Sequence, residues 1–154
     1  MISKMPEYGI EVPFKAIHII EYMRNYLKAN SGDVTPLNRK IAYQRPCASR
    51  YSPEIETILD EMFGLIGVER VAREYDRESA QCCGSLFSRI YPDRIRPMVE
   101  ANVDDASKAG AEAMVFLCPL CMSALGKPAS EKGMKPVILS QLARMALGEL
   151  PFPA

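Results

Sequence analysis

Hydrophobic positions along the chain alternate between short continuous runs and stripes at helical spacing. The strand-like runs fall at about residues 40–44, 68–75, 113–117 and 137–139. Helical stripes occupy about residues 14–29, 53–66, 96–109 and 140–148, with a further short helix beginning at Pro119. Strands that alternate with helices predict an α/β fold, an open and mainly parallel sheet flanked by helices.

Punctuating residues set the expected bounds of these elements. Ser52 is predicted to cap the second helix and Gly67 to end it. Pro97 is acceptable in the first turn of the helix over 96–109, because N–H groups in that turn have no partner within the helix and proline lacks this group. The run AMVFL at 113–117 is apolar throughout, as in a central parallel strand that is covered on both faces.

The first predicted helix has one apolar face and one polar face. The apolar face carries Ala16, Ile20, Met23 and Leu27. His18, the only histidine of the chain, falls on the opposite face, and we expect it to be a solvated surface residue.

Composition restricts the classes of partner. The 19 basic and 19 acidic residues cancel, so no net field attracts nucleic acid, and we expect no nucleic-acid partner. No apolar run approaches the roughly 20 residues of a transmembrane helix, and the charged start MISKMPEYGIEVPFK does not fit a secretory signal. A cytoplasmic location is expected. Five cysteines in a reducing compartment favour metal binding or redox chemistry over structural disulfides.

The cysteines follow three successive predicted strands. Cys47 follows the first, Cys82 and Cys83 follow the second, and Cys118 and Cys121 follow the third. Loops after parallel strands meet at the carboxyl edge of the sheet, where ligands bind. A single buried cysteine is commonly only a small apolar side chain. Five at three matching loop positions predict one shared site.

Each group of cysteines has local chemistry that suits thiolates. In CPLC, Cys118 takes the N-cap position, Pro119 the first helical position and Cys121 the third, so both sulfurs lie at the positive end of a helix. In CCG, Gly84 can adopt a positive φ and turn the chain tightly, and its missing side chain is expected to leave room for inorganic sulfide.

Metal type stays open at this point. Thiolates suit either zinc or iron with sulfide. A tetrahedral zinc site needs four thiolates and leaves one cysteine unexplained, and adjacent cysteines close poorly on a single ion.

The whole cysteine pattern resembles the cysteine-rich CCG domain found in the B subunits of heterodisulfide reductases and their relatives. The pattern is Cys47, then Cys82 and Cys83 followed by Gly84, then Cys118, Pro119, Leu120 and Cys121, and the ending KPVILSQLARMALGE is similar as well. The resemblance covers about residues 12–150. It implies one CCG domain over 14–154 after an N-terminal extension at 1–13. It further implies a noncubane [4Fe-4S] cluster held by all five cysteines, in an oxidoreductase subunit that exchanges electrons with a thiol or disulfide small molecule.

Two departures from the family pattern bear on partners. Family members usually carry two such domains, whereas this sequence has one copy, so a second CCG domain comes from another subunit or this sequence is one half of a larger protein. The resemblance also implies a ferredoxin-type or flavin subunit as a partner. Ser85 follows the CCG where many relatives have glycine. Arg45, Arg50, Ser85 and Arg89 lie near the cysteines and are candidates for contact with an anionic substrate, although structural or solvated roles are expected for them.

Two other functions remain in view. One is an electron relay for the oxidation of a hydroxy acid or succinate, although subunits of that kind normally carry ferredoxin-type cysteine repeats, and the sequence has none. The other is a zinc-binding structural or interaction domain, whose relatives tend to lack one of the five cysteines.

Overall fold

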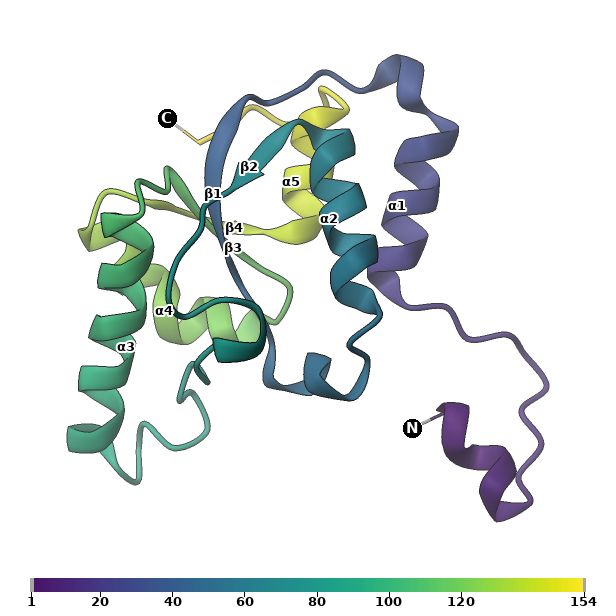
Figure 1. Cartoon of the computed structure of the whole chain (residues 1–154), viewed down its shortest axis with the longest axis horizontal. Coiled ribbons are helices and arrows are strands. Elements are labelled where there is room, and N and C mark those ends of the chain that lie inside the picture. Colours follow the sequence, from purple (N-terminus) through teal and green to yellow (C-terminus); the bar gives the residue numbers. More distant parts are fainter. Residues whose placement is uncertain (1, 154) are drawn as a thin grey trace.

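A four-stranded, entirely parallel sheet forms the centre of the chain. The structure is a computed structural model that describes residues 2–153. The strands are β1 (Arg39–Gln44), β2 (Val68–Arg70), β3 (Ala113–Phe116) and β4 (Lys135–Ile138), in the order β2-β1-β3-β4. The predicted fold class, an α/β protein with an open parallel sheet, is confirmed (Figure 1).

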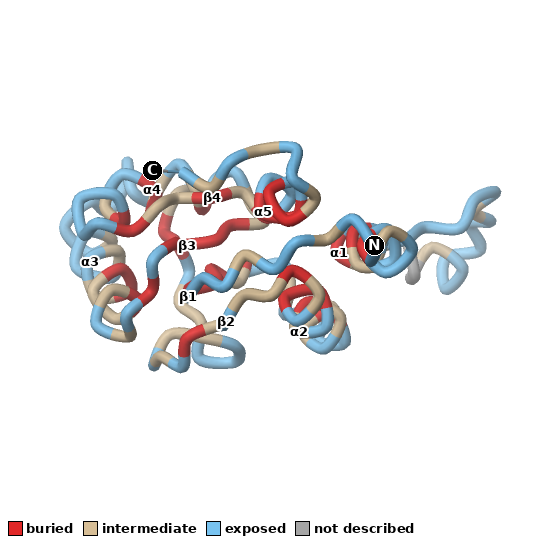
Figure 2. The backbone as a smooth tube through the Cα atoms, turned by 90° about the horizontal axis from the view of Figure 1, so that it is seen from above, coloured by how far each residue is buried: buried red, intermediate tan, exposed pale blue. Residues whose placement is uncertain are grey.

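Five α-helices cover the two faces of this sheet. One face packs against α1 (Ile19–Ala29), α2 (Ile55–Ile66) and α5 (Leu139–Ala146). The other packs against α3 (Pro92–Lys108) and α4 (Pro119–Glu131). Figure 2 shows the three layers from above, with buried backbone concentrated in the strands and on the inner sides of the helices. No helix between residues 2 and 153 combines the length and apolar character needed to cross a membrane.

Side-chain alternation along the two central strands explains their composition. Tyr43 and Val115 point into the core beneath α1, α2 and α5. Ala42, Met114 and Phe116 point into the core beneath α3 and α4. Because neither face of β3 meets water, its sequence is apolar throughout, as predicted from the run at 113–117.

Three helices begin at positions that differ from the prediction. Helix α1 begins at Ile19 rather than near residue 14, and His18 caps it, accepting a hydrogen bond from the Ile20 N–H at Nδ1 (3.2 Å). His18 is therefore a capping residue rather than a solvated one, and Ala16 lies outside the helix. Helix α2 begins at Ile55 with Glu54 in the N-cap position, so the predicted Ser52 cap is wrong.

Helix α3 begins at Pro92, about one turn before the predicted start. Pro97 consequently lies inside the helix instead of in its first turn. Pro92 occupies the first turn, where the missing proline N–H costs nothing. The loop from Gly84 to Tyr91 leads directly into this added turn, with the Ile95 N–H donating to the Tyr91 carbonyl (3.1 Å).

Strand β2 is much shorter than the predicted strand at 68–75. After Val71, whose N–H donates to the Ile41 carbonyl (2.9 Å), the chain leaves the sheet. The N–H groups of Glu74 and Tyr75 donate instead to the Asp105 carboxylate on α3 (3.1 and 2.9 Å). A long-range side-chain acceptor thus replaces the strand partner.

The N-terminal segment lies to one side of the sheet and helices (Figure 1). It contains a short 3-10 helix at Ile2–Tyr8 and reaches α1 through an extended stretch. Tyr8, Ile10, Phe14 and Ile17 are exposed apolar side chains there. The proposed division into an extension at 1–13 and a domain at 14–154 stays a prediction.

Candidate metal centre

The cysteine loops leave the carboxyl ends of three neighbouring strands. Cys47 opens the short 3-10 helix at Cys47–Tyr51 after β1, and Cys118 follows β3 directly. Cys82 and Cys83 lie in the long connection between β2 and α3. From β1 the chain crosses to β2, whereas from β3 it crosses to β4, so the sheet order reverses between β1 and β3. Ligands of open parallel sheets bind at such a reversal point.

All five cysteines line one cavity at this edge. The cavity has a volume of about 410 Å³ and contains wall atoms from Cys47, Cys82, Cys83, Cys118 and Cys121. Its remaining wall is largely apolar, with Tyr51, Leu86, Phe87 and Leu120 among the lining residues. The structure therefore brings together all the cysteines that the sequence singled out.

The sulfurs occupy different depths. Cys83 is 7% exposed and Cys121 is 3% exposed, and both pack within the core between the sheet and α4. Cys118 is half-buried, while Cys47 and Cys82 are exposed at the mouth. Within residues 2–153, no three side chains of His, Cys, Asp or Glu are grouped closely enough to bind one metal ion together. The thiols are instead distributed around the cavity.

Helix α4 begins as the CPLC pattern predicts. Cys118 is its N-cap in extended conformation, Pro119 is the first helical residue, and the Met122 N–H donates to the Cys118 carbonyl (3.1 Å). The Cys118 side chain makes no capping hydrogen bond to the backbone N–H groups of the helix. Cys121 then follows in the first turn, near the positive end of the helix dipole.

Gly84 turns the chain after the cysteine pair. Its φ is +71°, and its N–H donates to the Cys82 sulfur (3.4 Å). A side chain at this position would meet Ile95 of α3. The space left by the glycine is thus filled by Ile95, and the expected room for inorganic sulfide does not lie there.

The two inner thiols are electrostatically unequal. The pKa of Cys83 is lowered to about 6, because its thiolate accepts hydrogen bonds from the Cys121 thiol and from backbone N–H groups including that of Ser85, although burial opposes the shift. The pKa of Cys121 is raised, because its thiol is tied to the Cys83 thiolate and is buried beside it. The inner pair readily holds one negative charge and resists a second.

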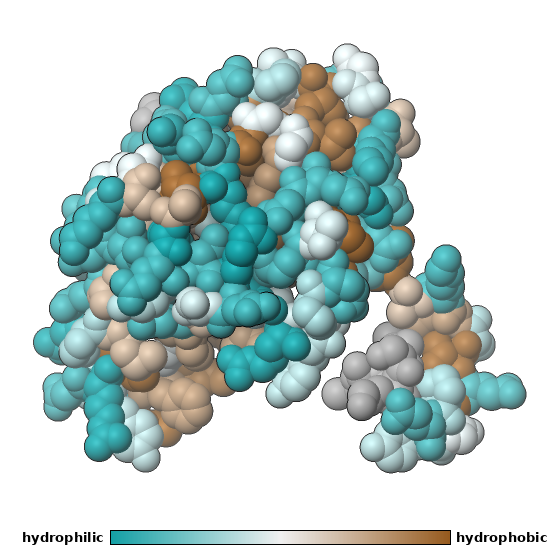
Figure 3. All heavy atoms as spheres, viewed as in Figure 1, coloured by the Kyte–Doolittle hydropathy of each residue, from teal (hydrophilic) through white to brown (hydrophobic). Residues whose placement is uncertain are grey.

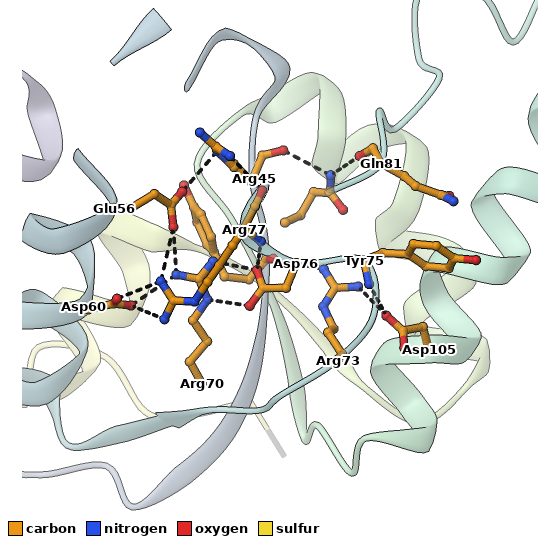
Figure 4. Close-up of polar contacts among 12 residues, drawn as sticks. Arg45, Glu56, Asp60, Arg70, Arg73, Tyr75, Asp76, Arg77, Gln81 and Asp105 are labelled. Carbon is orange, nitrogen blue, oxygen red and sulfur yellow. Dashed lines mark hydrogen bonds and ion pairs between the residues drawn. The ribbon is translucent and has the colours of Figure 1, made fainter. Parts of the chain in front are cut away.

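The basic residues near the cysteines have structural contacts, as expected for Arg45 and Arg50. Arg45 faces Glu56 (Nε to Oε1, 3.2 Å) and donates to the Arg77 carbonyl (2.7 Å), and Arg50 donates to the Cys47 carbonyl (2.9 Å). These arginines line a second, polar pocket of about 300 Å³ that shares Cys47 and Cys82 with the first. Figure 4 shows that acidic side chains face Arg45 and Arg77, so the charge of this pocket is largely compensated.

Apolar side chains surround the mouth of the cysteine cavity. Leu86 and Phe87 line the cavity, Ile90 and Tyr91 follow in the segment that leads into α3, and all four are exposed. Figure 3 shows apolar surface gathered at the lower edge of the body, around this segment. Sequence reasoning missed this rim, because exposed apolar residues in a loop have no periodicity.

Sequence reasoning also missed Gln44. It ends β1, and its amide contacts the loop that carries Cys82. The available signal was a polar residue directly after the run Ile41–Tyr43, on the face that alternation shares with Ala42.

Fold and site together define a doubly wound parallel α/β domain with the cysteines of three loops around one cavity. Comparison of the chain with protein families agrees with this class. The chain belongs to the CCG cysteine-rich domain family, which matches residues 41–126 and so includes all five cysteines. The predicted family membership is confirmed.

Two curated relatives are each named as the D subunit of dihydromethanophenazine:CoB–CoM heterodisulfide reductase. The protein from Methanosarcina barkeri is 27% identical over 146 residues, which are 91% of this chain and 36% of the relative. The protein from Methanosarcina acetivorans is 26% identical over 117 residues, 73% of this chain and 29% of the relative. The chain thus spans about a third of the length of these relatives. It is distantly related to a subunit of an oxidoreductase.

Proposed function

We propose that the domain binds a noncubane [4Fe-4S] cluster through Cys47, Cys82, Cys83, Cys118 and Cys121, and that it transfers electrons in a thiol/disulfide reaction. One observation carries the proposal: five cysteines from three separate loops line a single cavity at the carboxyl edge of the sheet. The cavity lies where the strand order reverses, and folds of this kind bind their ligands at that point.

The donor set fits such a group. Thiolates are the ligands of iron–sulfur clusters. Five cysteines line the one cavity, whereas a single tetrahedral ion needs only four thiolates, which favours a polynuclear group. The inner pair, Cys83 and Cys121, holds only one negative charge easily, so binding through both as thiolates requires a cationic group between them.

The surrounding residues have two roles. The N–H groups of Ser85 and Gly84 donate to cysteine sulfurs, and hydrogen bonds of this kind tune the potential of a bound cluster. Phe87 and Leu120 add apolar surface to the cavity wall around the sulfurs. When bound, the cluster would supply one-electron chemistry to a thiol or disulfide. The exposed sulfurs of Cys47 and Cys82 mark the side from which that substrate approaches.

The chain works as one subunit of a larger redox assembly. Its relatives are named as subunits of a heterodisulfide reductase, and the chain spans about a third of their length. A second CCG domain and a ferredoxin-type or flavin subunit are the proposed partners, with a small thiol or disulfide as substrate. A cytoplasmic location fits five cysteines that all remain as free thiols.

Anaerobic purification followed by iron, sulfide and zinc analysis tests the cluster. The proposal expects about four iron and four sulfide per chain. Replacing any one of the five cysteines by alanine, Cys83 above all, should remove the cluster or change its spectrum. Ser85→Ala is the matched control: it lines the same cavity without a sulfur and keeps the N–H group, so iron content should stay at the wild-type value.

Other outcomes separate the alternatives. One zinc per chain without iron, with the same zinc content in Cys83→Ala, would show a four-thiolate structural zinc site instead of a cluster. A cluster that is oxidised by disulfides and reduced by an artificial donor supports the thiol/disulfide reaction. A cluster that does not react with disulfides but accepts electrons from a hydroxy-acid or succinate dehydrogenase would instead identify the domain as an electron relay.

A further inference from the structure

A pair of buried amide side chains lies between β1 and α3. They are Gln44, at the end of β1, and Asn102, on α3, and each is 1% exposed. They contact each other: the Asn102 Nδ2 donates to the Gln44 Oε1 at 2.9 Å. Buried polar groups are costly unless all their hydrogen bonds are made, so this pair needs further partners on both sides.

The partners of Gln44 are the backbones of two cysteine loops. Its Nε2 donates to the Gln81 carbonyl (2.9 Å) and to the Arg45 carbonyl (3.2 Å). Gln81 directly precedes Cys82, and Arg45 lies two residues before Cys47. One amide group therefore joins the loop after β1 to the loop after β2. Figure 4 shows Arg45 and Gln81 on either side of the side chain that bonds to both.

The partner of Asn102 fixes the direction of every hydrogen bond in this network. Arg73, whose side chain is fully buried, donates to the Asn102 Oδ1 (2.8 Å) and to the Tyr43 carbonyl (3.0 Å). A guanidinium group can only donate. Asn102 must therefore present its oxygen to Arg73 and its NH₂ to Gln44.

The same logic continues to the cysteine loops. Gln44 accepts from Asn102 with its oxygen, so its own NH₂ faces the two loop carbonyls, which can only accept. The Asp105 carboxylate anchors the far end, 3.4 Å from Arg73. Neither side-chain amide of this network can be flipped without placing two donors or two acceptors opposite each other.

We propose that Gln44 is a positioning residue that holds the Cys47 and Cys82 sulfurs at the spacing required by a shared ligand, with Asn102 and Arg73 fixing its orientation. The inference rests on the proposed function only in assuming that both cysteines bind the same ligand. The spacing itself is a property of the metal-free chain. These two cysteines are the exposed ones, at the mouth of the cavity, where packing restrains the loops least.

The test is a pair of substitutions in the full chain. Gln44→Met keeps the length of the side chain but removes the donor. Asn102→Asp keeps the acceptor for Arg73 but turns an oxygen toward Gln44, which then has to reverse its amide and present oxygen to the loop carbonyls. Tyr43→Phe is the matched control: Tyr43 is a neighbouring residue of the same strand, also buried, whose side chain faces the other core.

The first measurement uses the metal-free protein. A reagent that bridges two thiols, followed by digestion and mass spectrometry, reports the yield of the Cys47–Cys82 crosslink. Both substitutions should lower this yield severalfold, and Tyr43→Phe should leave it unchanged. The second measurement is titration with Co²⁺, followed by its thiolate charge-transfer absorption, for which both substitutions should lower the affinity roughly 10- to 100-fold.

Circular dichroism and urea unfolding separate positioning from stability. If both substitutions lower the unfolding midpoint but keep the wild-type crosslink yield and Co²⁺ affinity, Gln44 is merely structural and the inference is overturned. Should Gln44→Met fail to fold, the decision passes to Asn102→Asp, which removes no side chain. If wild-type protein binds no Co²⁺ but both substitutions lower the crosslink yield, the inference stands and the proposed metal site fails.

Discussion

Gly84 packs directly against Ile95, so that the turn after the cysteine pair touches the first turn of α3. A Cβ added to Gly84 would collide with the Ile95 side chain, and the glycine has a φ of +71° that other residues rarely adopt. The contact joins the loop of Cys82 and Cys83 to the helix that follows it. Ile95 lies in the turn of α3 that begins at Pro92 and was not predicted from the sequence.

Gly84→Ala should destabilise the protein by about 1 to 3 kcal/mol, because the strained φ adds to the collision with Ile95. Urea unfolding of the metal-free protein measures the change. Gly64→Ala is the matched control: Gly64 lies exposed in the last turn of α2, where an added Cβ would meet no atom within 4 Å, and the substitution should stabilise by about 0.5 to 1 kcal/mol. Equal stability of the two variants would contradict the packing described.

The metal-free protein should ionise one thiol near pH 6. The pKa of Cys83 is about 6, because hydrogen bonds from the Cys121 thiol and nearby N–H groups stabilise its thiolate. The thiolate is present above that pH and is lost as the pH falls through it. Ultraviolet thiolate absorbance as a function of pH measures the transition. Cys83→Ala should abolish it, Cys121→Ala should move it to higher pH, and Cys47→Ala should leave it in place.

Asp76→Ala should destabilise the protein by about 2 to 4 kcal/mol, since it leaves the buried Arg70 with fewer acceptors. The Arg70 and Asp76 side chains are 6% and 10% exposed, and two hydrogen bonds of 2.9 and 2.5 Å join them. Thermal or urea unfolding gives the magnitude. Asp104→Ala, which breaks an exposed pair with Lys132, should change stability little, and a loss as large as that of Asp76→Ala would argue against burial as the cause.

Alkaline pH should weaken the fold partly through Tyr43. Burial raises the pKa of this phenol well above its usual range, and the Glu56 carboxylate raises it further. The unfolded chain therefore loses the proton first, so the contribution is present below about pH 10 and falls as the pH rises above it. Tyr43→Phe should reduce the fall in urea midpoint between about pH 9 and about pH 11. Tyr51→Phe, at an exposed position, should not.

Local elements followed from the sequence where a short pattern is sufficient. The buried stripe of α2, the apolar strand β3 and the start of α4 at Cys118 and Pro119 agree with the structure. Each depends on residues within a few positions of one another. Elements whose bounds depend on distant partners were predicted less well: β2 ends early because Asp105 takes the N–H groups of residues 74 and 75.

The sequence by itself determined that strands and helices alternate and that cysteines follow three of the strands, because periodicity and loop position depend only on residues close together in the sequence. Only the tertiary structure decided the strand order, the inner and outer depth of the sulfurs, and the contact of Gln44 with Asn102, 58 residues away. Such relationships arise when separate segments pack together, since burial and hydrogen-bond direction are properties of the assembled core rather than of any one segment.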